Sequence, residues 1–176
     1  KITPKDINLK AINNSDMIFL EGYLWDEGDP KNAFDFSIKN SKKVAMSLSD
    51  KFCVERHKTN FLKLVKHDLD VIFANEEEIM SLSDSKNFNE VIEFGRSIQK
   101  LLVITRGEKG AVSINKDGVK EVNAQKNLNI VDLTGAGDLF AAGFLHGYIN
   151  KFSEEDCLKK GTEMASKVIQ QIGARL

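Results

Sequence analysis

The sequence predicts an α/β fold in which a mostly parallel sheet is flanked by helices on both faces. Short apolar runs of strand length recur along the chain, and segments with helical spacing of apolar residues lie between them. Of the 176 residues, 41% are hydrophobic and 29% are charged, which is typical of globular proteins. No linker or internal repeat divides the chain, so we expect residues 1–176 to form a single α/β domain.

The first half of the chain predicts three buried strands and the helices between them. Thr3, Pro4 and Asp6 have the pattern of a helix start, with a capping residue, a proline in the first turn and an acid that reaches back. The predicted strands are the apolar runs 17–20, 44–48 and 71–74. The predicted helices cover residues 32–42, 55–67 and 76–81.

The second half predicts a helix over 88–98, a strand over 101–105 and then a hairpin. Strands 111–114 and 119–123 are joined by a turn that contains Asp117-Gly118, a pair that favours tight hairpin turns. Ile130-Val131 is interpreted as the end of another strand. A glycine-rich loop at 134–137 then leads into a largely apolar, buried helix that ends near Ile149, and Ser153 with Asp156 predicts a capping box for the last helix.

Composition excludes several classes of protein. The net charge of −1, from 25 basic and 26 acidic residues, argues against a nucleic-acid partner. No apolar run is long enough to predict a membrane span, and no signal peptide is recognisable.

Cys53 and Cys157 lie far apart, which predicts reduced thiols in a cytoplasmic protein. No two histidines share a metal-ligand spacing, so all three are interpreted as structural: His57, His67 and His146. The first residue is Lys1 rather than Met, which indicates a fragment or a processed chain.

Polar and glycine-rich segments follow three of the predicted strands. They cover residues 75–78, 105–110 and 132–138. Ligands of parallel α/β sheets bind beyond the carboxyl ends of the strands, so we expect these segments to gather along one rim.

The segment Gly135-Ala136-Gly137 precedes a helix and predicts an anion hole. The N–H groups at a helix start are unpaired, the helix dipole adds positive charge, and small residues let a phosphate approach. Asp138 in the first turn would then accept a proton from an attacking hydroxyl. The alternative is a tight turn with an acid that complements the dipole. Phe140 stands where a dinucleotide-binding fingerprint needs its third glycine, which argues against an oxidoreductase.

The other two segments each allow two interpretations. Asn75 and Glu78 are three residues apart, so they form either a capping box or a site that directs Mg²⁺ through water. Residues 105–110 form either a plain turn between strands or part of a nucleotide site, in which Arg106 contributes charge to a phosphate.

Three motifs together resemble the phosphofructokinase-B, or ribokinase-like, family of sugar and nucleoside kinases. Residues 131–144 resemble the second signature of that family, 75–78 resemble its N-x-x-E motif, and 105–110 resemble its T-x-G-x-x-G segment. Gly173-Ala174 resembles the closing turn of the family. Within it, residues 48–53 and 71–76 look most like the adenosine kinase branch.

The resemblance implies a role for each matching position. Asp138 would be the catalytic base, with Gly135, Ala136 and Gly137 as the anion hole. Asn75 and Glu78 would organise Mg²⁺ and phosphates, and Asp132 with Thr134 would hold a monovalent cation such as K⁺. The residues that would line the ATP site are Thr105, Arg106, Gly107 and Gly110.

The implied activity is ATP-dependent phosphoryl transfer to a hydroxymethyl group of a nucleoside or sugar. Adenosine is the first expected acceptor and ribose or a related sugar the second. A non-catalytic nucleotide-binding protein on the same fold is the alternative, against which the intact Asp138 argues. The N-terminal part of the family fold, with its lid and most acceptor contacts, is absent from the sequence. We therefore expect the 176 residues alone to be inactive, and their uncovered sheet edge to allow a homodimer.

Overall fold

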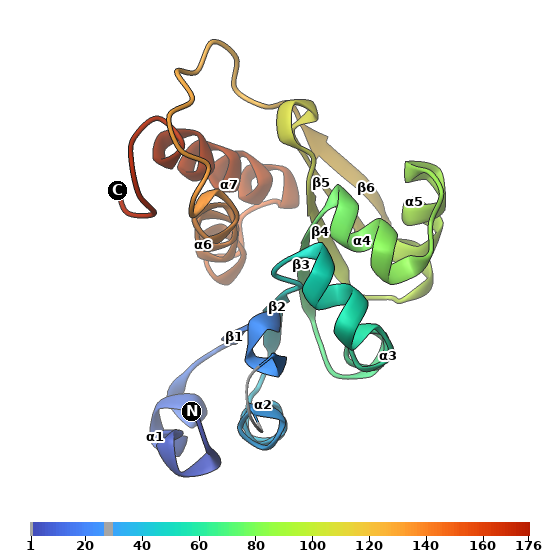
Figure 1. Ribbon diagram of the computed structural model, residues 1–176, viewed down its shortest axis with the longest axis vertical. Helices are drawn as coiled ribbons and strands as arrows, with labels where there is room; N and C mark the ends of the chain where they lie inside the picture. Colours follow the sequence, from blue (N-terminus) through green and yellow to red (C-terminus); the bar gives the residue numbers. More distant parts are fainter. Residues whose placement is uncertain (1, 27–29) are drawn as a thin grey trace. The chain divides into compact units, whose positions relative to one another are not determined.

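A six-stranded sheet organises the chain, of which the computed structural model describes residues 2–26 and 30–176 (Figure 1). Its strands follow one another in chain order: β1 (Ile18–Glu21), β2 (Val44–Ser47), β3 (Val71–Asn75), β4 (Leu101–Thr105), β5 (Ala111–Asn115) and β6 (Gly118–Val122). The first three strands are parallel. Strands alternate with helices, so the predicted α/β class is confirmed.

Seven α-helices occur among the described residues. They are α1 (Leu9–Asn14), α2 (Pro30–Lys39), α3 (Lys51–His67), α4 (Glu76–Ser83), α5 (Phe88–Ser97), α6 (Ala136–Ile149) and α7 (Glu154–Val168). Three short 3₁₀ turns accompany them: η1 (Pro4–Asp6), η2 (Gly22–Trp25) and η3 (Gly107–Lys109). None of the described helices is long and apolar enough to cross a membrane.

The chain divides into two compact units. The first contains Lys1–Val103 with Ile114–Gly118, and the second contains Ile104–Ser113 with Val119–Leu176. Each unit thus holds parts of the last three strands. Whether all 176 residues act as one domain stays a prediction.

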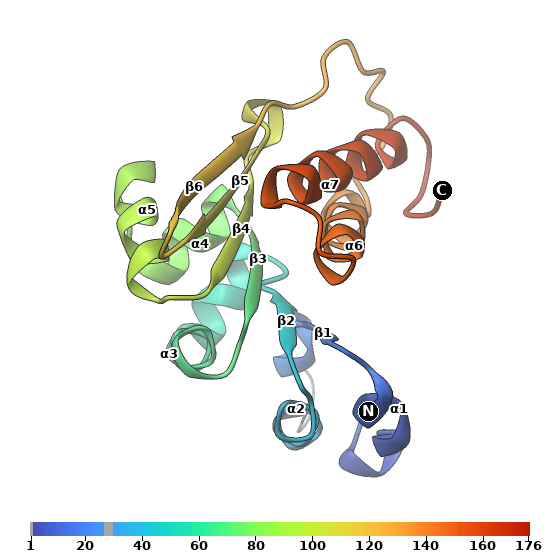
Figure 2. The same cartoon turned by 180° about the vertical axis from the view of Figure 1, so that it is seen from behind.

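The core of the first unit lies around β2 and β3. Val71, Ile72, Phe73 and Ala74 are all buried, as expected for a strand that is covered on both faces. In both views α3, α4 and α5 lie on the same side of β3 (Figures 1 and 2).

Three predicted elements of the first unit need correction. The strand at 17–20 is only partly buried, because β1 is first in the strand order; Phe19 is 38% exposed. Helix α3 begins at Lys51 rather than 55, because the carboxylate of Asp50 accepts a hydrogen bond from the backbone of Cys53 at 2.6 Å. The capping box at Thr3 and Asp6 is real, but it starts only the turn η1.

The second unit is built on a helical hairpin and a β-hairpin. Helices α6 and α7 pack against each other so closely that a Cβ on Gly161 would lie 2.8 Å from the carbonyl oxygen of Phe140. Ser153 caps α7 as predicted, because its hydroxyl oxygen accepts a hydrogen bond from the backbone N–H of Asp156 at 3.1 Å. The reciprocal half of the predicted capping box does not form, since the carboxylate of Asp156 accepts from the hydroxyl of Ser153, at 2.6 Å, rather than from its backbone. Ser113 of β5 donates to the carboxylate of Glu154 at 2.9 Å, which ties the strand to the start of α7.

Two expectations about this unit were wrong. Ile130-Val131 forms no strand; the backbone N–H of Val131 instead donates to the carbonyl of Ile169 at 2.8 Å, and both apolar side chains are exposed. Two apolar residues between Asn129 and Asp132 are too few to make a buried strand. Helix α6 is not buried all round either, because its buried residues lie among others that are exposed, such as Ala142 and Ile149.

Candidate functional site

The loop before α6 is fixed by contacts with the end of the chain. Gly135 has a φ of 81°, and a Cβ there would lie 2.6 Å from the Cβ of Ala174. One carboxylate oxygen of Asp132 accepts hydrogen bonds from the backbone (2.9 Å) and hydroxyl (2.7 Å) of Thr134. The other accepts one from the backbone of Gly173 at 2.9 Å. These bonds, led by that of the Thr134 hydroxyl, hold the pKa of Asp132 below its usual value.

The first turn of α6 presents unpaired N–H groups. The N–H of Ala136 donates to the carbonyl of Leu133 at 3.2 Å, whereas those of Gly137 and Asp138 have no acceptor among the described residues. A Cβ built on Gly137 meets nothing within 4 Å, so the space in front of the turn is open. The side chain of Asp138 is exposed in the same turn. The first turn of α6 thus carries both free N–H groups and a carboxylate.

A cavity of about 380 Å³ lies beside this turn, and all of its lining residues belong to the second unit. We call it the apolar cavity. Its apolar side chains include Leu128, Ile130, Leu133, Phe140, Ala165 and Ile169. Ala136 and Gly137 also line it, so the start of α6 forms part of its wall. This is the composition of a small-molecule site: apolar walls with few polar groups.

The segment after β4 contributes to the same wall. Thr105, Gly107 and Gly110 line the apolar cavity, whereas Arg106 does not. The segment is held tightly, because the backbone N–H of Arg106 donates to the carbonyl of Gly110 at 2.8 Å. Three of the four residues predicted here therefore lie beside the start of α6.

Asn75 and Glu78 lie in the first unit and form a reciprocal capping box. The side-chain oxygen of Asn75 accepts from the backbone of Glu78 at 2.8 Å. The carboxylate of Glu78 accepts from the backbone of Asn75 at 3.0 Å and from its side-chain amide at 2.6 Å. The capping interpretation is confirmed. Because Glu78 is only 5% exposed, its carboxylate is also unusually buried for a surface cap.

Burial gives Glu78 a perturbed ionisation. Removal from water raises the pKa of Glu78 to about 7, helped by the charges of Asp50 and Glu21 and opposed by the bonds from Asn75. Asp50 itself accepts a hydrogen bond from the hydroxyl of Tyr23 at 2.7 Å, which raises the pKa of Tyr23 to about 12. Sequence reasoning missed that acidic groups surround Glu78, because Glu21, Asp50 and Glu78 come from three separate segments of the chain.

The substitution Glu78→Gln should flatten the pH dependence of stability. Above pH 4.5 the unfolded chain loses the proton of Glu78, while the folded chain keeps it until about pH 7. Stability therefore falls as the pH rises through this window, by up to roughly 3 kcal/mol. Glutamine keeps the capping box and cannot ionise. Urea unfolding at pH 5 and pH 8 measures the difference; the exposed neighbour Glu77→Gln is the control and should behave like the parent. An equal pH dependence in Glu78→Gln and the parent would contradict the raised pKa.

One other cluster in the described ranges has side chains that bind metals. Ligand atoms of Asp26, Cys53 and His57 lie within 4.8 Å of one another. Arg56, however, donates to both carboxylate oxygens of Asp26, at 2.9 and 2.5 Å, and His57 lies 2.9 Å from one of them. Burial raises the pKa of Cys53 to about 11, so the thiol keeps its proton. We interpret the cluster as an ion-pair network.

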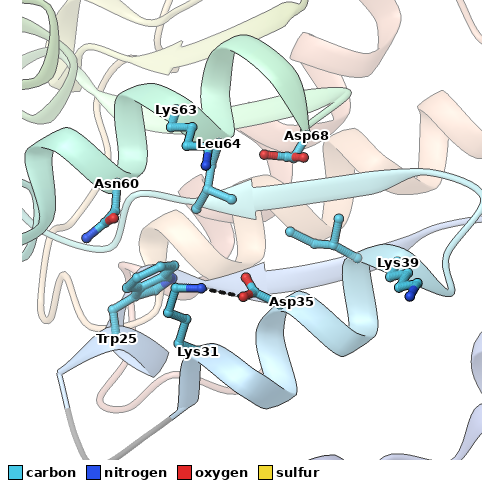
Figure 3. A pocket seen from close by; sticks show the side chains of 9 residues that line it. Trp25, Lys31, Asp35, Lys39, Asn60, Lys63, Leu64 and Asp68 are labelled. Carbon is cyan, nitrogen blue, oxygen red and sulfur yellow. Dashed lines mark hydrogen bonds and ion pairs between the residues drawn. The ribbon is translucent and has the colours of Figure 1, made fainter.

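A second cavity, of about 430 Å³, lies between α2 and α3 in the first unit (Figure 3). Its wall mixes both charges, and Lys31 pairs with Asp35 there at 2.5 Å. Trp25 closes one end. None of the residues predicted from the sequence to be functional lines this cavity.

Comparison with known proteins identifies the family to which the chain belongs. Residues 1–176 match the pfkB family carbohydrate kinase description. The chain belongs to the PfkB family of carbohydrate kinases. It is 31% identical to a nucleoside kinase of Methanocaldococcus jannaschii over 84% of its length and 34% identical to a cytidine kinase of Thermococcus kodakarensis over 65%. The crystal structure of adenosine kinase from Sinorhizobium meliloti matches all of the chain with a TM-score of 0.97 and 36% identity.

The PfkB chain described here spans about half the length of these relatives. It covers 48% of the nucleoside kinase, 42% of the cytidine kinase and 55% of the adenosine kinase structure. The predicted family, the ribokinase-like α/β fold and the correspondence to part of that fold are confirmed. The roles of individual site residues stay predictions.

Sequence reasoning missed most of the apolar cavity. Its walls draw on residues 124–130 and on one face of α7, neither of which carries a motif. Two signals were available in retrospect. Ile130 and Leu133 are large apolar residues in a segment with no strand pattern, and they are 57% and 65% exposed. Small residues at the facing positions of α6 and α7, such as Gly143 and Gly161, indicate close helix packing beside them.

Proposed function

We propose that the protein transfers the terminal phosphoryl group of ATP to a hydroxymethyl group of a nucleoside. The observation that carries this proposal is the first turn of α6. There, the free N–H groups of Gly137 and Asp138 and the carboxylate of Asp138 share one turn, and that turn lines a cavity with apolar walls. N–H groups stabilise the charge of a phosphoryl group under attack, and a carboxylate next to them accepts the proton of the attacking hydroxyl.

This arrangement indicates where the phosphates and the base of ATP would lie. Phosphates would lie at Gly135, Ala136 and Gly137, where the helix dipole favours negative charge. The base and ribose would lie in the apolar cavity, against Thr105, Gly107 and Gly110. Arg106 does not line the cavity, so in this proposal its charge acts on the phosphates from outside the wall. Such transfer depends mainly on positioning and charge stabilisation, which suits a site with few polar side chains.

Mg²⁺ is the ion that this reaction uses to neutralise phosphate charge. Asn75 and Glu78 fit it chemically, because the buried carboxylate of Glu78 faces the charges of Asp50 and Glu21 and lacks a cation beside it among the described residues. Carboxylate oxygens are the ligands that Mg²⁺ prefers, often through water. Asp132 and Thr134 would hold the monovalent cation; their oxygens already bind each other, so the ion would use the remaining lone pairs.

A nucleoside is the acceptor that the relatives favour, since the three reported above are a nucleoside kinase, a cytidine kinase and an adenosine kinase. A sugar such as ribose is the second candidate, because the family description names carbohydrate kinases. In both cases the protein would be an enzyme with a small-molecule acceptor.

Two measurements test the proposal. Calorimetric titration of the 176-residue chain with Mg-ATP should show one binding site per chain. Phosphorus NMR of the complete natural polypeptide with ATP and either adenosine, cytidine or ribose should then show a phosphomonoester and ADP. Product with a nucleoside supports the proposal, and product with ribose alone would replace the acceptor by a sugar. ATP binding without any phosphomonoester would favour the non-catalytic alternative.

A further inference from the structure

The cavity between α2 and α3, which we call the α2–α3 cavity, has no part in the proposed function. All of its lining residues belong to the first unit. Its volume of about 430 Å³ is that of a small-molecule site. The two walls are facing sides of the helices, with Lys31, Asp35, Ile38 and Lys39 on α2 and Asn60, Lys63 and Leu64 on α3, followed by Asp68.

Trp25 closes one end of the α2–α3 cavity and contains a polar group without a partner (Figure 3). Its indole nitrogen is shielded from solvent and has no hydrogen-bond partner in residues 2–26 and 30–176. An indole N–H can only donate, and buried donors in native proteins are nearly always paired. An acceptor on a ligand in the cavity would satisfy this N–H group.

Neighbouring rings hold the Trp25 ring in place. Phe34 and Phe61 are both buried and meet it edge-on, with ring centroids 5.7 and 6.1 Å away. The ring of His57 lies 5.9 Å from it. Because these contacts fix the ring, the indole does not turn to donate to bulk water, and an acceptor would reach it from the cavity.

The other side chains near Trp25 are mostly hydrogen-bond donors. The ammonium of Lys31 lies 6.0 Å from the centre of the Trp25 ring, and Asn60 lies at the same end of the cavity (Figure 3). Lys63 follows on the next turn of α3. The acid on the facing helix, Asp35, is already paired with Lys31 at 2.5 Å. This end of the cavity therefore favours an oxyanion.

The rest of the cavity limits the shape and charge of the ligand. Ile38 and Leu64 supply apolar surface between the two helices. Lys39 and Asp68 share the far end and have opposite charges (Figure 3). Three lysines and two aspartates line the cavity altogether, so its net charge is positive. A ligand with an apolar body and one anionic group matches this lining.

We propose that the α2–α3 cavity binds a small organic anion whose carboxylate or phosphate accepts a hydrogen bond from the indole N–H of Trp25 and pairs with Lys63. The apolar body of the ligand would lie against Ile38 and Leu64. The proposal is independent of phosphoryl transfer, because these contacts belong to the first unit and the proposed phosphate-binding turn belongs to the second.

Trp25 is the only tryptophan of the chain, so its fluorescence reports on this cavity directly. Phenylacetate and phenyl phosphate share an apolar ring and differ in the anionic group, and benzyl alcohol is the neutral control. Titration of the 176-residue chain with either anion should change the fluorescence and reach saturation, whereas benzyl alcohol should not change it. The anion that binds more tightly identifies the preferred group. No saturable change with both anions would overturn the proposal.

Three variants locate the binding, with phenylacetate affinity measured by calorimetry. Trp25→Phe keeps an aromatic ring and removes the N–H, so affinity should fall at least about tenfold, as for a lost charge-assisted hydrogen bond. Lys63→Gln should weaken binding by about two- to fivefold, as for an exposed ion pair. Lys66→Gln removes the same charge from an exposed position of α3 that does not line the cavity, and should bind like the parent.

The comparison of the two lysine variants decides even if Trp25→Phe fails to fold, because both lysines are exposed. Weaker binding by Lys63→Gln alone supports the site. Equal losses in Lys63→Gln and Lys66→Gln would indicate non-specific attraction to a basic surface and would overturn the proposal. Parent-like affinity of Lys63→Gln, or of a folded Trp25→Phe protein, would also overturn it.

Discussion

Asp138→Asn is expected to reduce phosphoryl transfer by roughly 10²–10⁴-fold and to leave ATP binding nearly unchanged. An asparagine amide fills the same space beside the free N–H groups of the first turn of α6, but it cannot accept the proton of an attacking hydroxyl. Because the side chain is exposed, the substitution should not affect folding. Turnover is measured in the complete natural polypeptide, and Mg-ATP binding by calorimetry.

The chain contains a matched control for this substitution. Asp156 occupies the same position in the first turn of α7 as Asp138 does in α6, and it bonds with its own capping residue, Ser153, at 2.6 Å. Asp156→Asn therefore changes the charge at a helix start without touching the proposed site. Its turnover should stay within a factor of two of the parent. Similar rates in the two variants would show that Asp138 only complements its helix dipole.

Gly135→Ala and Gly137→Ala should have opposite effects, although the two glycines are two residues apart. At Gly135 the left-handed backbone alone costs an alanine about 1–2 kcal/mol, and its Cβ would meet Ala174 at 2.6 Å, so the variant should lose at least this much stability. At Gly137 a Cβ meets nothing within 4 Å, and alanine is the better helix former by up to about 1 kcal/mol. That variant should be at least as stable as the parent.

The two substitutions should also differ in their effect on phosphate binding, where Gly137→Ala is the damaging one. The methyl group of Gly137→Ala would occupy the open space in front of the free N–H groups, where we place the phosphates. Loss of charge-assisted hydrogen bonds there should weaken tripolyphosphate binding by roughly ten- to a hundredfold. Unfolding in urea and calorimetric titration of both variants measure the two effects. Unchanged tripolyphosphate binding by a stable Gly137→Ala protein would exclude this turn as the phosphate site.

Elements of the fold with a strong local pattern were predicted correctly from the sequence. Strands β2, β3 and β4 are apolar except for the last residue of each, because both faces of these strands are covered. The hairpin of β5 and β6 follows from its turn, in which the side chain of Asn115 accepts from the backbone of Gly118 at 3.1 Å. Where tertiary contacts decide, the prediction failed: Val131 bonds to the end of α7, which no local pattern around it reveals.

The candidate site shows the same difference between features encoded locally and features that depend on tertiary contacts. The positions with glycine or acid motifs were found because their chemistry is encoded in a few adjacent residues, as for Asn75 and Glu78. The burial of Glu78 depends on segments that are distant in the chain, so its raised pKa could not be foreseen.

The bond between Asp132 and Gly173 has a consequence for the order in which the protein forms during synthesis. The two residues are 41 positions apart, and Gly173 is followed by Ala174, against which the turn at Gly135 packs. The β-hairpin, the sheet and α6 all precede residue 173 in the chain and have their own local contacts. The loop in front of α6 lacks this support until residues 173 and 174 have left the ribosome. We therefore expect a nascent chain to form its sheet and α6 before the turn at Gly135 is fixed in place.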